Sequence, residues 1–447
     1  TVVAAVDAPA LQATDAIGRA GGARLGGARL STGASGGFTL GRQPRDAFAY
    51  NLALDLERGV RDIPALGSAS GVALTGAGVA PGAAADVLTA ARGVGLPGAF
   101  AGVERVRDGV SWIGRFDDVR DSLTVRTLTT IGGWSTEQGL GLGPLAAASA
   151  SGARRDRALG VQLVSRDFVG AGRRRLSETR LGVSGTWRDV RPTVALPTAT
   201  VLVPAARLSD PATGPIADPI SNPTAEPTAA LTLGGGGLLA LDERRWTAEG
   251  ANETIWNARG TRHRFKTLVW GRADGLRDAS APNALGTFVF PSPAAFAAGE
   301  AASFTRVLAQ PPRDGAVWNA AAALAHQWTP TRTLNVLYGV RLEANGAFDA
   351  PAANPALAQT LPGLRTGAAP RLVHASPRAG FTWTYSRAAE NRNLPVSNAF
   401  GGFYRAATGV VRGGIGEFRS LLRPGTLAEA RAATGLADGT LLLTCVG

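Results

Sequence analysis

Apolar and polar residues alternate along much of this 447-residue chain. The clearest runs are 48–57, 334–343 and 380–386. Because successive side chains of a strand point to opposite faces, each run predicts a strand with one face in an apolar medium and the other in a polar one. Weaker runs of the same period predict further strands, roughly a dozen in all, near 123–131, 159–163, 181–187, 191–203, 231–242, 246–257, 262–270, 318–328 and 410–418.

The connections between these runs alternate in length. Residues 329–333 form a short turn that contains Pro330, whereas 271–316 and 344–375 are long. Short turns at one end and long loops at the other are typical of an outer-membrane β-barrel, whereas a soluble sandwich has more even spacing. We expect short helices at 82–92, 292–299 and 426–435, and an irregular connection at the proline-rich segment 209–230.

Composition narrows the functional classes. Hydrophobic residues make up 45% of the chain, which excludes a disordered polypeptide. The 46 basic and 34 acidic residues give a net charge of +12, but the one dense arginine cluster, at 173–175, is interpreted as a solvated loop, so we expect no nucleic-acid partner. No apolar run is long enough for a transmembrane helix. The chain contains no methionine, even at position 1, which predicts a processed chain or an internal fragment.

An ordered series of short motifs resembles a known family. The motifs are His263-Arg264-Phe265-Lys266, Trp328-Thr329-Pro330, the sequence LNVLYGVRLE at 334–343, Ser376-Pro377-Arg378-Ala379-Gly380-Phe381 and the stretch 411–419. Together they resemble the Oar-like branch of TonB-dependent receptors, which are bacterial outer-membrane β-barrels. The resemblance covers about 120–447 and is looser over 1–119.

The resemblance implies a barrel of about 22 strands, filled by a plug domain and energised by an inner-membrane coupling protein. We therefore expect an all-β fold, an antiparallel up-and-down transmembrane β-barrel in the outer membrane. Residues 1–447 would form part of this single barrel domain, with 1–119 as its less certain N-terminal strands and without the plug or an N-terminal β domain.

The function implied by the resemblance is energy-coupled uptake of a large or scarce solute whose identity the sequence does not reveal. Two alternatives stay open. One is an adhesion or surface-organising barrel that transports nothing, and the other is a soluble β-sandwich or β-propeller.

The alternation also assigns side chains to two environments. One set of residues is expected to face lipid: Leu334, Val336, Tyr338, Val340, Leu342, Phe381 and Trp383. The opposite parity then directs Arg341, Glu343, Arg378, Thr382 and Thr384 to the lumen, where they would contact the plug or line the transport route. A charge on the lipid face near mid-bilayer costs about 2–4 kcal/mol, so this parity should be well enforced.

No motif indicates catalysis, a metal or a cofactor, and we expect no enzyme. His263, His326 and His374 show no ligand spacing, and His326 is expected at the membrane interface. The glycine clusters 234–237 and 413–416 lack the lysine and hydroxyl of a phosphate-binding loop, so a structural role is expected. Asp117 and Asp118 lie in an arginine-rich stretch, which favours a solvated charge network.

Cys445 is the single cysteine. The family resemblance implies a disulfide with a residue beyond Gly447, and the alternative is a free, buried thiol.

Overall fold

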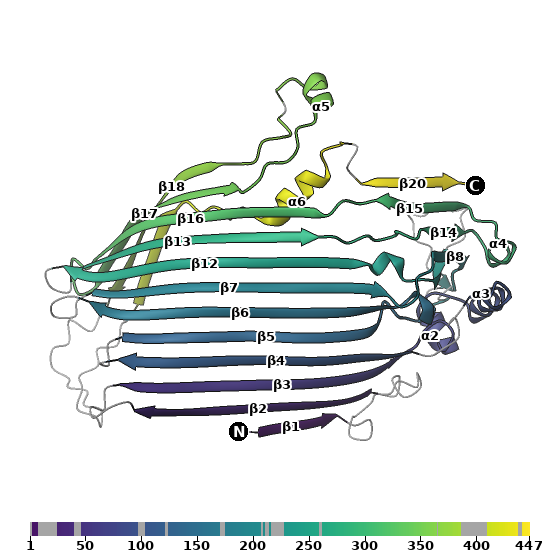
Figure 1. The fold of residues 1–447 in the computed structure, drawn as a ribbon, viewed down its shortest axis with the longest axis horizontal. Coiled ribbons are helices and arrows are strands. Elements are labelled where there is room, and N and C mark those ends of the chain that lie inside the picture. The colour runs from purple at the N-terminus through teal and green to yellow at the C-terminus, as the bar shows by residue number, and fades with distance from the viewer. Residues whose placement is uncertain are drawn as a thin grey trace.

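A long antiparallel sheet dominates the structure (Figure 1). The computed structural model describes residues 2–7, 25–39, 46–96, 103–120, 124–169, 175–206, 209–210, 214–215, 228–258, 262–363, 365–385, 409–436 and 440–447. Within them the main sheet has 13 strands, in the order β1 (Val2–Asp7), β2 (Leu25–Thr39), β3 (Ala47–Ile63), β4 (Val103–Arg120), β5 (Thr124–Leu140), β6 (Gly152–Val169), β7 (Arg175–Pro192), β12 (Leu241–Ala258), β13 (His263–Asp278), β16 (Arg313–Trp328), β17 (Leu334–Ala347), β18 (Leu372–Tyr385) and β19 (Gly409–Gly416).

The main sheet has an up-and-down topology, as the alternating short and long connections predicted. Every neighbouring pair is antiparallel, and strand order follows chain order apart from the steps from β7 to β12 and from β13 to β16. At these steps the intervening chain leaves for a second sheet. Several strands run longer than the sequence indicated, so the long connections shrink to 279–312 and 348–371. The edge strands are β1 and β19.

A second sheet lies at the end of the main strands where the long connections are found, which we call the long-connection end (Figure 1). The opposite end is the short-turn end. The order of the second sheet is β11 (Thr228–Gly234), β8 (Thr198–Pro204), β14 (Thr287–Phe290), β15 (Ser303–Ala309) and β20 (Leu441–Val446). Helices α2 (Gly71–Gly76), α3 (Pro81–Gly93) and α4 (Pro293–Ala298) contribute to the same core. We call this assembly the cap. Its fully buried side chains include Val79, Val87, Val201, Leu231 and Leu233.

The cap corrects two strand predictions. Segments 191–203 and 231–242 were expected as strands of the main sheet. Instead β8 and β11 pair with each other, and β8 also pairs in parallel with β14. Their apolar side chains are buried in the cap core rather than exposed on a sheet face. Of the irregular connection expected at 209–230, the structure describes the two-residue strands β9 (Ser209–Asp210) and β10 (Gly214–Pro215) and the start of β11.

The predicted helices are present. In α4, the Ser292 hydroxyl accepts a hydrogen bond from the Ala295 amide, and Gly299 ends the helix with φ 77°. Helix α3 covers the run expected at 82–92. The third helix, α6 (Pro424–Ala432), begins before the predicted capping box at Thr426, because Pro424 occupies its first turn. Helix α5 (Pro355–Thr360) lies in the connection between β17 and β18, and none of the described helices is long and apolar enough to cross a membrane.

Candidate functional site

The strand register divides the main sheet into two faces. Even-numbered residues of β3, β4, β5, β12, β16 and β17 share one face with odd-numbered residues of β6, β7, β13 and β18. We call this the apolar face, because it exposes large hydrophobic side chains, among them Leu52, Leu163, Leu181, Val183, Val269, Leu324 and Val340. The opposite side, which carries most of the ion pairs, is the polar face; exposed hydrophobic exceptions on it include Ile113, Ile131, Phe168 and Leu337.

Aromatic side chains lie at two levels along the strands of the apolar face. Trp256, Phe265, Trp328 and Trp383 lie near the short-turn end, and Trp134, Trp187, Trp246 and Trp318 lie nearer the long-connection end. On β12 the two levels are 246 and 256, and on β16 they are 318 and 328. Ten residues span about 33 Å along a strand. At a strand tilt of about 40°, this corresponds to a band of about 25 Å.

Tryptophan rings cover glycines across the strands of the apolar face. Trp112 faces Gly132, and Trp246 faces Gly275, in direct register. A Cβ added at either glycine would lie 2.0 Å from the indole, so no larger residue fits beneath the ring. These glycines keep the rings flat against the sheet, which is a recognised means of fixing strand register.

The residues predicted to face lipid and lumen fall on opposite faces. Leu334, Val336, Tyr338, Val340 and Leu342 share the apolar face with Phe381 and Trp383. Arg341, Glu343, Arg378, Thr382 and Thr384 share the polar face. Which medium each face meets stays a prediction.

Two of the predicted polar residues lie in direct contact. The Arg341 guanidinium is 2.7 Å from a Glu343 carboxylate oxygen, and the Ser376 hydroxyl donates to the other oxygen at 3.0 Å. Arg378 lies apart from this pair and donates to the Glu417 carbonyl at 3.3 Å. Thr382 and Thr384 lie closer to the short-turn end of β18.

A larger ion-pair network on the polar face was not predicted. Glu137 on β5, with 8% of its side chain exposed, pairs with Arg105 on β4 and with Arg154 on β6. Arg154 also reaches Asp156 at 2.9 Å, and Asp156 accepts from Arg188 on β7 at 2.8 Å. The network therefore joins four strands. The alternation predicts the face of each residue, but only the register brings them together.

A hollow of about 580 Å³ lies beside this network, and we call it the first hollow. It spans β3 to β7 and β12. Four acidic polar-face residues line it, Asp55, Glu57, Asp156 and Glu243, and so do three polar-face arginines, Arg107, Arg188 and Arg245; Arg157 also lines it but belongs by register to the apolar face. Because this lining mixes both signs of charge, the hollow suits a polar solute with little net charge. The volume lies within the range of small-molecule sites, about 300–1,000 Å³.

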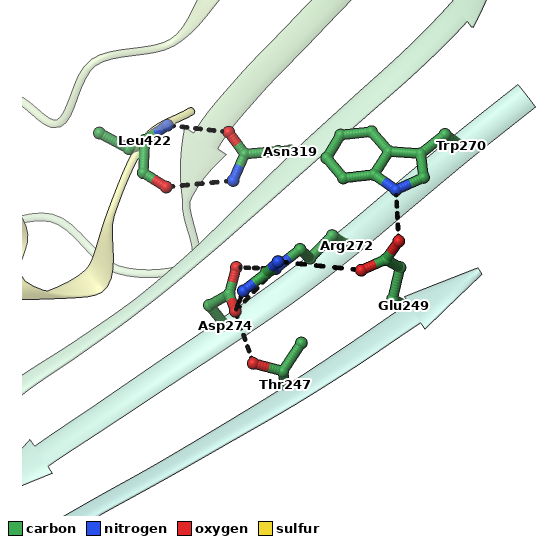
Figure 2. A network of polar contacts seen from close by, with 7 residues as sticks. All are labelled: Thr247, Glu249, Trp270, Arg272, Asp274, Asn319 and Leu422. Atoms are coloured by element: carbon green, nitrogen blue, oxygen red, sulfur yellow. Dashed lines mark hydrogen bonds and ion pairs between the residues drawn. The ribbon is translucent and has the colours of Figure 1, made fainter. Parts of the chain in front are cut away.

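A second polar cluster lies on β12 and β13 (Figure 2). Arg272 donates to Asp274 at 2.8 Å, and Asp274 accepts from the Thr247 hydroxyl at 2.7 Å. Glu249 accepts from the Trp270 indole at 2.9 Å and lies 3.8 Å from Arg272. Trp270 is the single tryptophan of the nine that the register places on the polar face.

Residues 417–434, which we call the crossing segment, pack onto the polar face beside this cluster. The Asn319 amide on β16 donates to the Leu422 carbonyl at 3.1 Å and accepts from the Leu422 amide at 3.0 Å (Figure 2). Helix α6 continues over β16, where the Pro424 carbonyl would lie 2.3 Å from a Cβ added at Gly315. The segment therefore buries Val317, Asn319 and Ala321.

The histidines form a pair that their sequence spacing did not indicate. His263 and His326 face each other across β13 and β16, with ring nitrogens 3.0 Å apart, and the second His326 nitrogen lies 2.7 Å from the Tyr338 hydroxyl. All three lie on the apolar face at the aromatic level near the short-turn end. Among the described residues, no group of three or more His, Cys, Asp or Glu side chains could hold a metal ion.

The remaining sequence features are structural or lie apart from the polar face. A Cβ at Gly235 would lie 2.1 Å from the Leu196 carbonyl, so the glycine cluster at 234–237 allows close backbone packing. Asp117 and Asp118 point to opposite faces and pair with Arg115 and Arg120.

Two predictions fall at the limits of the described chain. Cys445 is free and exposed, so the expectation of a buried thiol is wrong, while the disulfide to a residue beyond Gly447 stays a prediction. Of the arginine cluster at 173–175, the first two residues lie outside the described residues, and Arg175 begins β7.

Similarity to known proteins is found among solved structures. No protein family and no curated protein matches the sequence. The outer membrane transporter YddB from Escherichia coli has a similar structure, with a TM-score of 0.43 and 11% sequence identity. The matched region covers 81% of this chain and 36% of that transporter, so this chain corresponds to about a third of its length.

Proposed function

We propose that this chain forms part of the wall of a bacterial outer-membrane β-barrel through which a solute is taken up. The observation that carries the proposal is the division of the main sheet into an apolar face, bounded by two aromatic levels about 25 Å apart, and an ion-paired face. Exposed aliphatic residues meet lipid favourably, and aromatic residues favour the two interfaces.

The edges of the sheet support a larger barrel. Strands β1 and β19 each pair on one side within the described chain. In lipid, an unpaired strand edge leaves backbone N–H and C=O groups without partners, at several kcal/mol per group. In the proposed barrel, these two edges would therefore pair with further strands.

We infer that uptake is energy-coupled, as in TonB-dependent receptors. A barrel of this kind holds a plug, and the ion-paired polar face would contact both the plug and the passing solute. The first hollow, lined by charges of both signs, offers one contact surface for a polar ligand. An inner-membrane coupling protein would move the plug.

Conductance tests this mechanism. The full-length native protein, reconstituted in a planar bilayer, should pass little current, because a plug blocks the barrel. Mutants of the host that lack either this protein or the energy-coupling protein should share the same growth defect on a limiting nutrient. Free ion conductance by the intact protein would instead establish a passive porin.

The cap favours a second candidate function, adhesion or surface organisation. The connection 279–312 does not form a loose loop but shares a buried core with residues of 64–96 and 193–240, whereas no described residue of 348–371 contributes to that core. Such a rigid surface could bind a partner without any transport. Deleting the connection 279–312 separates the two functions: loss of partner contact with unchanged nutrient growth supports adhesion, and loss of growth supports uptake.

A further inference from the structure

A second hollow on the polar face differs in character from the first. It measures about 390 Å³ and spans β13 and β16 to β19, toward the short-turn end. The polar-face residues that form its floor are apolar or lack a side chain: Leu268, Ala323, Ala325, Leu337, Gly339, Gly380 and Gly414. Elsewhere this face carries ion pairs, so a smooth apolar floor indicates contact with an apolar group.

The charges around the second hollow have one sign. Lys266, Arg341 and Arg378 line it, and no acidic residue does. Lys266 and Arg341 have carboxylate partners outside the lining, Glu253 and Glu343, each at 2.7 Å.

Arg378 is bound differently from the other two cations. It donates a hydrogen bond to the Glu417 backbone carbonyl at 3.3 Å and contacts the Phe418 ring, whose centroid lies 4.3 Å from the guanidinium carbon. Neither contact neutralises the guanidinium. Arg378 is therefore the cation of the hollow that is best placed to receive an anionic group.

We propose that the second hollow binds an amphipathic anion, with its anionic head at Arg378 and its apolar chain or ring along Leu268 and Leu337. The proposal rests on the proposed function, in which the polar face lines an aqueous lumen. Charge complementarity selects the anion, since three cations and no carboxylate of the described chain line the second hollow, whereas residues of both signs line the first. The volume is within the range of small-molecule sites, about 300–1,000 Å³.

Photolabelling of the native full-length protein in lipid nanodiscs tests the proposal. The probe is a decanoate that carries a diazirine near its terminal carbon, and mass spectrometry locates the labelled residues. We expect labels on the hollow floor, at Leu268, Ala323 or Leu337, that excess decanoate removes and excess decanol does not. Arg378→Gln should reduce this labelling about tenfold, because a hydrogen bond to a charged group contributes about 1.5–3 kcal/mol, and Arg378→Lys should retain most of it.

A matched variant and a second probe separate the possible failures. Arg188→Gln removes an arginine from the first hollow on the same face and should leave decanoate labelling unchanged. A neutral apolar diazirine dissolved in the bilayer should label Leu181, Val183 and Val269 in every variant, which also shows that the variants fold.

Each remaining outcome has a distinct meaning. If the neutral probe labels the apolar face but the decanoate probe does not label the hollow floor, the amphipathic-anion site is overturned and the proposed function stands. This result would also be obtained if a plug segment fills the hollow. Floor labelling that Arg378→Gln leaves unchanged also overturns it. If the neutral probe does not label the apolar face, the proposed function itself fails.

Discussion

At the scale of single residues, neighbouring positions on one strand should respond oppositely to a charge. Val183 on β7 lies on the apolar face with 63% of its surface exposed, and Ser184 lies on the polar face. Because lipid would surround an arginine at 183, Val183→Arg should lower the free energy of unfolding by about 2–4 kcal/mol. Denaturant titration of the protein in lipid vesicles measures this change.

Ser184→Arg is the control, since it adds the same side chain one residue away. We expect it to change the free energy of unfolding by less than about 1 kcal/mol, as is usual for a solvated charge. Equal losses at the two positions would contradict the assignment of lipid to the apolar face.

The buried carboxylate of Glu137 gives a second prediction at this scale. Glu137 pairs with Arg105 and Arg154, which are 36% and 30% exposed. Glu137→Gln keeps the shape but leaves the two guanidinium groups without an anion between them, so it should cost about 1–3 kcal/mol. Glu249→Gln is the comparison: its side chain is 44% exposed, and its pair with Arg272 should contribute at most about 1 kcal/mol. A larger loss at Glu249 than at Glu137 would refute this ranking.

At the scale of elements, one side chain ties the crossing segment to the sheet. Asn319 makes two hydrogen bonds to the Leu422 backbone, at 3.1 and 3.0 Å, and is itself 3% exposed. In Asn319→Ala both Leu422 groups lose their partner, so amide hydrogen exchange across residues 417–434 should accelerate at least tenfold. Asn345→Ala is the matched control, because Asn345 lies directly opposite on β17 and its side-chain oxygen has no partner. Similar acceleration in both variants would show that the Asn319 hydrogen bonds do not hold the crossing segment on the sheet.

The elements also show how far the sequence predicts this fold. Alternation located the central strands, because the period of two follows from strand geometry alone. It placed β8 and β11 in the wrong sheet, since a strand buried in a small core alternates like one that faces lipid. The His263–His326 pair and the Glu137 network escaped prediction for a related reason: each depends on the register between strands far apart in sequence, which alternation does not fix.

At the scale of the whole molecule, the cap and the main sheet differ in what holds them together. The cap has a buried aliphatic core, whereas the main sheet exposes its large apolar side chains on one face. Leu233 is fully buried in the cap, so Leu233→Ala should destabilise the cap by about 2–5 kcal/mol through lost contacts and a cavity. The main sheet depends on strand pairing and, in the proposed membrane setting, on lipid, so it should be unaffected.

Hydrogen exchange in lipid resolves the two parts within one experiment. In Leu233→Ala, amides of β8, β11 and β14 should exchange faster, while those of β5 to β7 keep their wild-type rates. Leu163→Ala gives the converse comparison, because Leu163 is 41% exposed on the apolar face and its truncation leaves no internal cavity. If Leu233→Ala accelerated exchange throughout the main sheet, cap and sheet would form one cooperative unit, and the cap would be required for the barrel wall rather than only for binding at its mouth.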